Sequence, residues 1–143
     1  MPVSQKLLHT LQRVGYPDEY LDELEYGILE KAVKDFNKID YIFKGTYNNE
    51  NTIFVIADNI LVGYMEDKIY IDQSINRTNT VVFKLLKIRS FWGVRDVFDI
   101  NHKVAFRLGN SMYWISNLER VEVINILKYI RDKVYSENFK VVI

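Results

Sequence analysis

The chain has 143 residues, 48% of them apolar and 27% charged, a composition that favours one soluble domain with a buried core. Nineteen basic residues balance nineteen acidic ones, so no global field attracts nucleic acid, which we do not expect as a partner. Cysteine is absent, which excludes disulfides, thiolate metal sites and cysteine nucleophiles. No window approaches the ~18 apolar residues of a membrane span, and we expect a cytoplasmic protein.

Residues 1–37 predict an N-terminal helical hairpin. Ser4 is a suitable N-cap for the first helix, and Gly15 suits its end. A second helix is expected from Pro17, because proline fits a first turn and acids at 18, 19, 22 and 23 complement the helix dipole. Its apolar residues recur at helical spacing: Leu21, Leu24, Ile28, Ala32 and Phe36. The sequence does not indicate whether this hairpin covers a sheet or projects from it.

From residue 38 the pattern changes to short runs rich in Val, Ile, Phe and Tyr. The runs cover 39–47, 51–57, 60–65, 68–72, 80–89, 94–100, 103–108 and 111–116. Three of the breaks are two-residue turns, Asp58-Asn59, Glu66-Asp67 and Gly109-Asn110. Because a parallel crossover needs about a dozen residues, connections this short predict an antiparallel meander.

A last amphipathic helix is predicted over 118–135, with Asn117 as its N-cap. Its expected buried side is Leu118, Val121, Ile124, Leu127, Ile130 and Val134. The tail, 136–143, can add an edge strand, bind a partner or fray. As a hypothesis, its apolar residues form an interface: Phe139, Val141, Val142 and Ile143.

The order of these segments resembles the bacterial pleckstrin-homology (PH)-like domain family. The resemblance covers about residues 38–135. It is carried by the runs TIFVIADNILVGYM, TVVFKLLKIRS, KVAFRLGNSMYWIS and NLERVEVINILKYIRDKV. It implies an α+β fold, in which a small antiparallel meander forms a barrel or bent sheet capped by the C-terminal helix. It also implies a binding or assembly module and a prokaryotic or phage origin. The early turn departs from the family, which often has Thr and a basic residue where this chain reads Ala57-Asp58-Asn59-Ile60.

Residues 84–107 carry six basic side chains against two acidic ones, around the aromatic pair Phe91-Trp92. One interpretation is a site for an anionic small molecule, nucleotide or lipid headgroup. It would use Lys84, Lys87, Arg89, Phe91, Trp92, Arg95, Lys103 and Arg107. The favoured alternative is an ordinary charged surface, neutralised by the acidic 17–36 segment, with Trp92 half-buried at a strand bend that Gly93 permits.

Alternation in β-strands puts Met112 and Trp114 on one face of their run, and we expect Trp114 to pack in the core. His9 and His102 are expected at the surface, since neither has a second ligand at a usual metal spacing. No nucleophile elbow or glycine-rich phosphate loop is present in the sequence. We therefore expect no catalytic residues, no metal and no cofactor. The expected function is non-enzymatic binding or assembly through protein contacts, with a second copy of the chain among the candidate partners.

Overall fold

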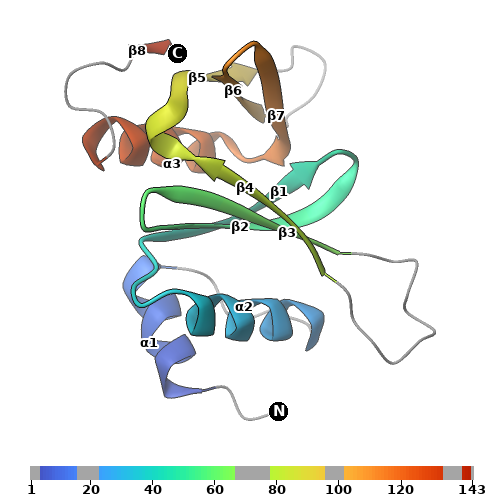
Figure 1. The fold of residues 1–143 in the computed structure, drawn as a ribbon, viewed down its shortest axis with the longest axis vertical. Coiled ribbons are helices and arrows are strands. Elements are labelled where there is room, and N and C mark those ends of the chain that lie inside the picture. Colours follow the sequence, from blue (N-terminus) through green and yellow to red (C-terminus); the bar gives the residue numbers. More distant parts are fainter. Residues whose placement is uncertain (1–3, 16–22, 67–77, 96–101, 134–139, 143) are drawn as a thin grey trace. The chain divides into compact units, whose positions relative to one another are not determined.

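The computed structural model describes residues 4–15, 23–66, 78–95, 102–133 and 140–142 (Figure 1). The helices are α1 (Gln5–Val14), α2 (Glu23–Asp35) and α3 (Arg120–Lys133). The strands are β1 (Tyr41–Tyr47), β2 (Glu50–Ala57), β3 (Ile60–Glu66), β4 (Thr78–Lys84), β5 (Ile88–Arg95), β6 (His102–Leu108), β7 (Ser111–Leu118) and β8 (Lys140–Val142). Among the described residues, no helix has the length and apolar character needed to cross a membrane.

The strands form one sheet in the order β4-β3-β2-β1-β7-β6-β5-β8. β1 to β4 lie side by side, β7 pairs antiparallel with β1, β6 and β5 follow β7 in turn, and β8 runs parallel to β5. The expected α+β class, with an antiparallel meander and a C-terminal helix, is therefore confirmed. β4 and β8 are the two edges of an open sheet, so the expected barrel is not confirmed.

One of the expected strands needs correction, and two others cannot be compared with the structure in full. The run 80–89 is not one strand, because a 3₁₀ turn at Leu85–Lys87 separates β4 from β5. The run 68–72, most of 94–100 and the turn residue Asp67 lie outside the described residues. The turn Asp58-Asn59 is confirmed, with φ of 51° and 63°, and Asn48-Asn49 adopt the same conformation at 50° and 64°. Both fit the two-residue hairpin turns that asparagine tolerates.

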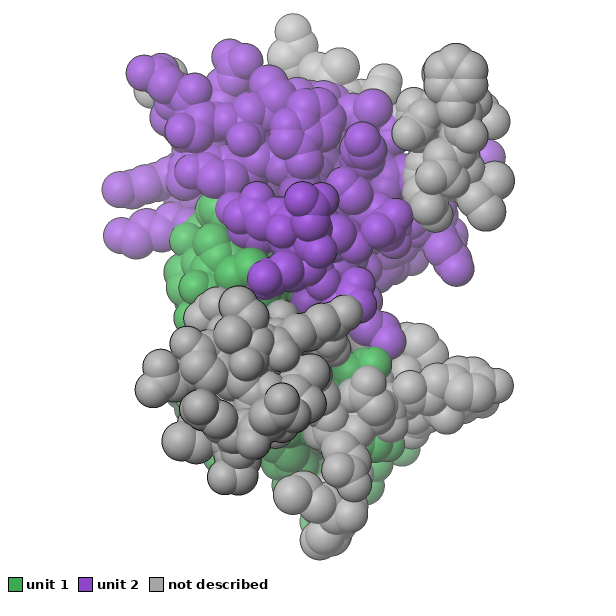
Figure 2. Space-filling model, turned by 90° about the vertical axis from the view of Figure 1, so that its right-hand side faces the viewer, with its two compact units in different colours: residues 1–43, 52–83 green, residues 44–51, 84–143 purple. Residues whose placement is uncertain are grey.

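The chain divides into two compact units, coloured in Figure 2. Unit 1 contains residues 1–43 and 52–83, and unit 2 contains residues 44–51 and 84–143. The structure thus groups the N-terminal helices with strands β2, β3 and β4, whereas the sequence divided the chain into 1–37, 38–135 and a tail. The acidic 17–36 segment belongs to unit 1, and the basic 84–107 segment belongs to unit 2.

In unit 1, the helical hairpin covers a sheet face. Leu7 and Leu11 of α1 and the buried side of α2 join β1–β3 in one core, which includes Ile28, Leu29, Ala32, Val33, Ile39, Ile42, Ile53, Val55, Ala57, Val62 and Tyr64. Ser4 caps α1 as predicted, since its Oγ accepts a hydrogen bond from Leu7 N–H at 3.1 Å. Gly15 ends the helix at φ 72°, also as predicted. The apolar stripe of the hairpin is therefore buried within unit 1.

In unit 2, α3 covers one face of β5 and β6. The predicted N-cap of this helix is wrong, and its predicted buried side is right only in part. Asn117 is not its N-cap: it belongs to β7 at φ 57°, and its side-chain amide donates a hydrogen bond to Thr46 Oγ1 at 2.8 Å. The expected buried side is confirmed at Leu118, Leu127 and Ile130 and is wrong at Val121 and Ile124, which are exposed. The true buried positions are Val123, Ile126, Leu127 and Ile130. An α-helix has 3.6 residues per turn, so positions spaced strictly by three do not stay on one face of it.

Candidate binding face on the outer side of β5–β7

The register of three strands sorts their side chains into two faces. Phe91 of β5, Phe106 of β6 and Tyr113 of β7 are directly opposite one another. Their rings stack with centroid distances of 5.4 Å for each neighbouring pair. Phe91 and Phe106 are fully buried, so this row faces the core. Because neighbouring residues on a strand point to opposite faces, the adjacent row, Trp92–Ala105–Trp114, faces the other way.

The next outward-facing positions along the three strands lie on either side of the row Trp92–Ala105–Trp114. Ser90, Arg107 and Met112 are opposite one another, and Val94 is opposite Lys103. We call the following set the tryptophan face: Trp92, Lys103, Ala105, Arg107, Met112 and Trp114. Trp114 is 43% exposed and Met112 is 41% exposed, although both are large apolar side chains. Ala105, placed between the two indoles, has no exposed surface.

The prediction that Trp114 packs in the core is therefore wrong. The alternation within the run was read correctly, but its faces were assigned the wrong way round: Ile115 is buried and Trp114 is exposed. The reason is that α3 and the aromatic stack fill the side of the sheet on which Ile115 lies. A strand that alternates two apolar sets does not indicate which set faces the core.

Phe91, Trp92 and Gly93 have three different roles. Phe91 is fully buried in the core stack, so it is not available to a ligand at the surface. Trp92 is half-buried, as predicted. Gly93 does not mark a bend, because β5 keeps its register with β6 from Ser90 to Arg95. Its role is close approach: a Cβ at this position would lie 2.8 Å from Val123 Cγ1 of α3.

The predicted basic cluster is only partly brought together. Lys103 and Arg107 lie in β6 on the tryptophan face, where Lys103 is half-buried and Arg107 is exposed. Lys84 at the end of β4 and Lys87 in the 3₁₀ turn are exposed, and neither belongs to the strands that form this face. The backbones of Arg89 and Arg95 belong to β5, and their side chains lie outside the described part.

Of the tail, Lys140–Val142 form β8, in which Val141 is in register with Phe91 and Val142 with Trp92. The backbone at Val141 and Val142 thus adds an edge strand, one of the three alternatives that the sequence left open. Phe139 and Ile143 lie outside the described residues. His9 is exposed, as predicted. His102 is half-buried, and its Nδ1 is buried without a hydrogen-bond partner among the described residues.

One tyrosine hydroxyl of unit 2 has a shifted pKa. Burial raises the pKa of the Tyr47 hydroxyl, and the neighbouring Tyr113 adds to the effect while a hydrogen bond with Asn48 opposes it. The neutral, protonated form of Tyr47 is therefore the one that this partly buried position favours. Among the described residues, no three His, Asp or Glu side chains gather where they could hold a metal ion. The side chains that can bind a partner or ligand lie on the tryptophan face. The two indoles and the Met112 thioether offer apolar contact, and Lys103 and Arg107 offer positive charge.

A scan against models of known protein families finds none that matches the chain, and no curated protein matches its sequence. Among solved structures, the hSac2 domain from the human phosphoinositide phosphatase Sac2 is similar, with a TM-score of 0.51. The alignment covers 86% of this chain and 90% of that one, at 7% sequence identity. At this identity the likeness concerns the fold alone, and function has to be argued from the site.

Proposed function

We propose that the chain is a non-catalytic, cytoplasmic binding module of pleckstrin-homology-like type that contacts a partner protein through the tryptophan face. The observation that carries the proposal is the row Trp92–Ala105–Trp114, extended by Met112, on a sheet face opposite the one that α3 covers. Tryptophan and methionine are enriched at protein interfaces, and an exposed tryptophan is a frequent source of binding energy. Arg107 beside this row supplies the polar edge that such interfaces have.

Site-directed photo-crosslinking in the cells that make the protein tests this proposal. The photoreactive residue p-benzoylphenylalanine replaces Trp114 in one variant and Lys128, an exposed residue of α3, in the matched control. We expect one discrete crosslinked product from position 114 and none from position 128. A product of twice the chain mass identifies a second copy as the partner. No product at position 114, or equal products at both positions, contradicts the proposal.

A second candidate function is binding of an anionic small molecule, nucleotide or lipid headgroup at the same face. Lys103 and Arg107 flank Ala105 on β6, which places two cations beside the indole row. The solved relative is a domain of a phosphoinositide phosphatase, so phosphoinositide headgroups are the first ligands to test, followed by nucleotides. A ligand at a hundredfold excess over its Kd stabilises the fold by ~2.7 kcal/mol. A rise in Tm that Arg107→Gln removes supports this candidate, and no rise with any of these ligands rejects it.

A further inference from the structure

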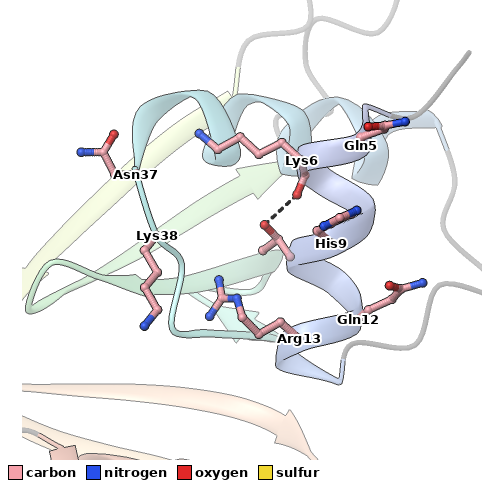
Figure 3. A pocket seen from close by; sticks show the side chains of 8 residues that line it. Gln5, Lys6, His9, Gln12, Arg13, Asn37 and Lys38 are labelled. Carbon is pink, nitrogen blue, oxygen red and sulfur yellow. Dashed lines mark hydrogen bonds between the residues drawn. The ribbon is translucent and has the colours of Figure 1, made fainter.

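A second feature lies in unit 1, whereas the strands that form the tryptophan face belong to unit 2. Residues of α1 and of the segment that follows α2 border an open hollow of about 940 Å³ (Figure 3). Sites for small molecules have volumes of roughly 300–1,000 Å³, so the hollow has room for a ligand of that size.

Three cations line this hollow. Lys6 and Arg13 come from α1, and Lys38 comes from the segment between α2 and β1. Figure 3 shows the side chains of Lys6 and Arg13 extending from the helix toward the segment that carries Lys38. Two of these positions are fixed by hydrogen bonds: Lys6 Nζ donates to Phe36 O at 3.2 Å, and an Arg13 guanidinium nitrogen donates to Ile39 O. Each of these groups keeps further N–H donors for a ligand.

No acidic side chain is among the residues that line the hollow, all of which lie in the described part of the chain. The nearby acids of α2 are used elsewhere. Glu30 Oε1 accepts a hydrogen bond from Ser4 N–H at 2.8 Å, and Asp35 is hydrogen-bonded to the Tyr64 hydroxyl. The whole chain has equal numbers of acids and bases, so this local excess of positive charge reflects the placement of these residues. Concave surfaces lined by one sign of charge concentrate ligands of the opposite sign.

The spacing of the cations selects the kind of anion. Lys6 and Arg13 are seven residues apart on α1, which corresponds to two helical turns and roughly 10 Å. Each charged end is also held at a different backbone carbonyl, Lys6 at Phe36 O and Arg13 at Ile39 O. Two or three linked phosphates can extend between two cations that are held apart in this way. Lys38 faces the same hollow from the other side.

We propose that this hollow binds a small molecule that carries two or more phosphate groups. Arg13 offers a planar pair of donors, which suits bidentate contact with a phosphate, and Lys6 and Lys38 act as point charges. This site is separate from the tryptophan face and does not depend on the function proposed for it.

Isothermal titration calorimetry with inorganic triphosphate, at low ionic strength, tests the proposal. Lys38→Gln is the main variant, since Lys38 is exposed and its charge can be removed without loss of packing. Lys31→Gln is the matched control, because Lys31 is an exposed lysine of α2 in the same unit and does not line the hollow. We expect Lys38→Gln to weaken triphosphate binding about tenfold, as loss of one charge-assisted contact does, and Lys31→Gln to leave it unchanged. The double variant Lys6→Gln/Lys38→Gln, checked for native circular dichroism, should weaken it further.

Three results would overturn the proposal: no binding of triphosphate, equal affinity for triphosphate and orthophosphate, or equal weakening by Lys31→Gln and Lys38→Gln. A parallel arm uses vesicles that contain phosphatidylinositol bisphosphate. If Lys38→Gln abolishes vesicle binding, a lipid headgroup is the source of the phosphates. If only the soluble triphosphate binds, a free polyphosphate compound is the source. Substitution of Trp114 should not change either result, which keeps this test distinct from that of the tryptophan face.

Discussion

Replacement of Gly93 by alanine tests how closely α3 approaches β5. The added Cβ would lie 2.8 Å from Val123 Cγ1, about 0.6 Å inside the 3.4 Å at which ordinary contact begins, and 3.4 Å from Leu127 Cδ1. Both neighbours are buried, so neither can move away freely. Overpacking of this kind costs about 1–3 kcal/mol, of which the lower backbone entropy of alanine in the unfolded chain recovers about 0.5–1 kcal/mol. We expect a net loss of roughly 1–2 kcal/mol in the free energy of unfolding.

Urea denaturation followed by circular dichroism measures this loss, and a double-mutant cycle assigns its cause. Val123→Ala alone should cost about 1–2 kcal/mol for two buried methyl groups. Combined with Gly93→Ala, it makes room for the new Cβ, so the double variant should be more stable than the sum of the single effects by about 1 kcal/mol. Gly27→Ala is the control, because a Cβ there meets nothing within 4 Å, and a helical alanine should stabilise the fold by up to about 1 kcal/mol. A neutral Gly93→Ala, or additive effects in the cycle, would refute the reasoning.

Three further predictions concern a buried phenol, a helix end and the two tryptophans. Burial, with a smaller contribution from a neighbouring carboxylate, raises the pKa of Tyr64 to about 12 from an ordinary 10. Folding therefore favours the neutral phenol, and this stabilisation is complete below pH 10 and is lost between pH 10 and about 12, at roughly 1.4 kcal/mol per pH unit. Tyr64→Phe should lack this alkaline loss in urea titrations, and an unchanged slope would contradict it. Gly15→Ala should lower the stability by about 1 kcal/mol in thermal melts. A Cβ at Gly15 would meet no other atom, but φ is 72°, a backbone conformation that strains alanine. A higher Tm would show that α1 ends differently. Trp92→Phe leaves Trp114 as the single tryptophan, and Trp114→Phe leaves Trp92. Trp114 should emit at longer wavelength and be quenched more by acrylamide than Trp92, because it is the more exposed of the two. The reverse order would contradict the proposed tryptophan face.

Signals confined to a few neighbouring residues were enough to locate most elements. Ser4 and Gly15 marked both ends of α1, because capping depends on side chains and backbone angles within one turn. Asp58-Asn59 located the β2–β3 turn for the same reason, since asparagine tolerates positive φ. The half-buried state of Trp92 was also predicted, but from a bend at Gly93 that the structure does not have.

The candidate site was only partly predictable. Trp92, Lys103 and Arg107 were singled out from the sequence, but Trp114 was assigned to the core and Met112 was not considered as a site residue. Both belong to the tryptophan face because β6 aligns Ala105 with Trp92 on one side and with Trp114 on the other. Two successive strand pairings bring Trp92 and Trp114 onto one face although they are more than twenty positions apart, and no local pattern specifies that register. The hollow bordered by Lys6, Arg13 and Lys38 was missed for the same reason, since its cations come from two segments.

The sequence by itself determined the α+β class, the short antiparallel connections and the lack of any cysteine chemistry, because composition and local periodicity control these properties. Only the tertiary structure decided which face of β7 is buried, why position 93 needs glycine, and where the apolar stripe of the N-terminal hairpin is used. Each of these depends on which surface packs against which. Burial is a property of two surfaces together, and an amphipathic segment specifies only one of them.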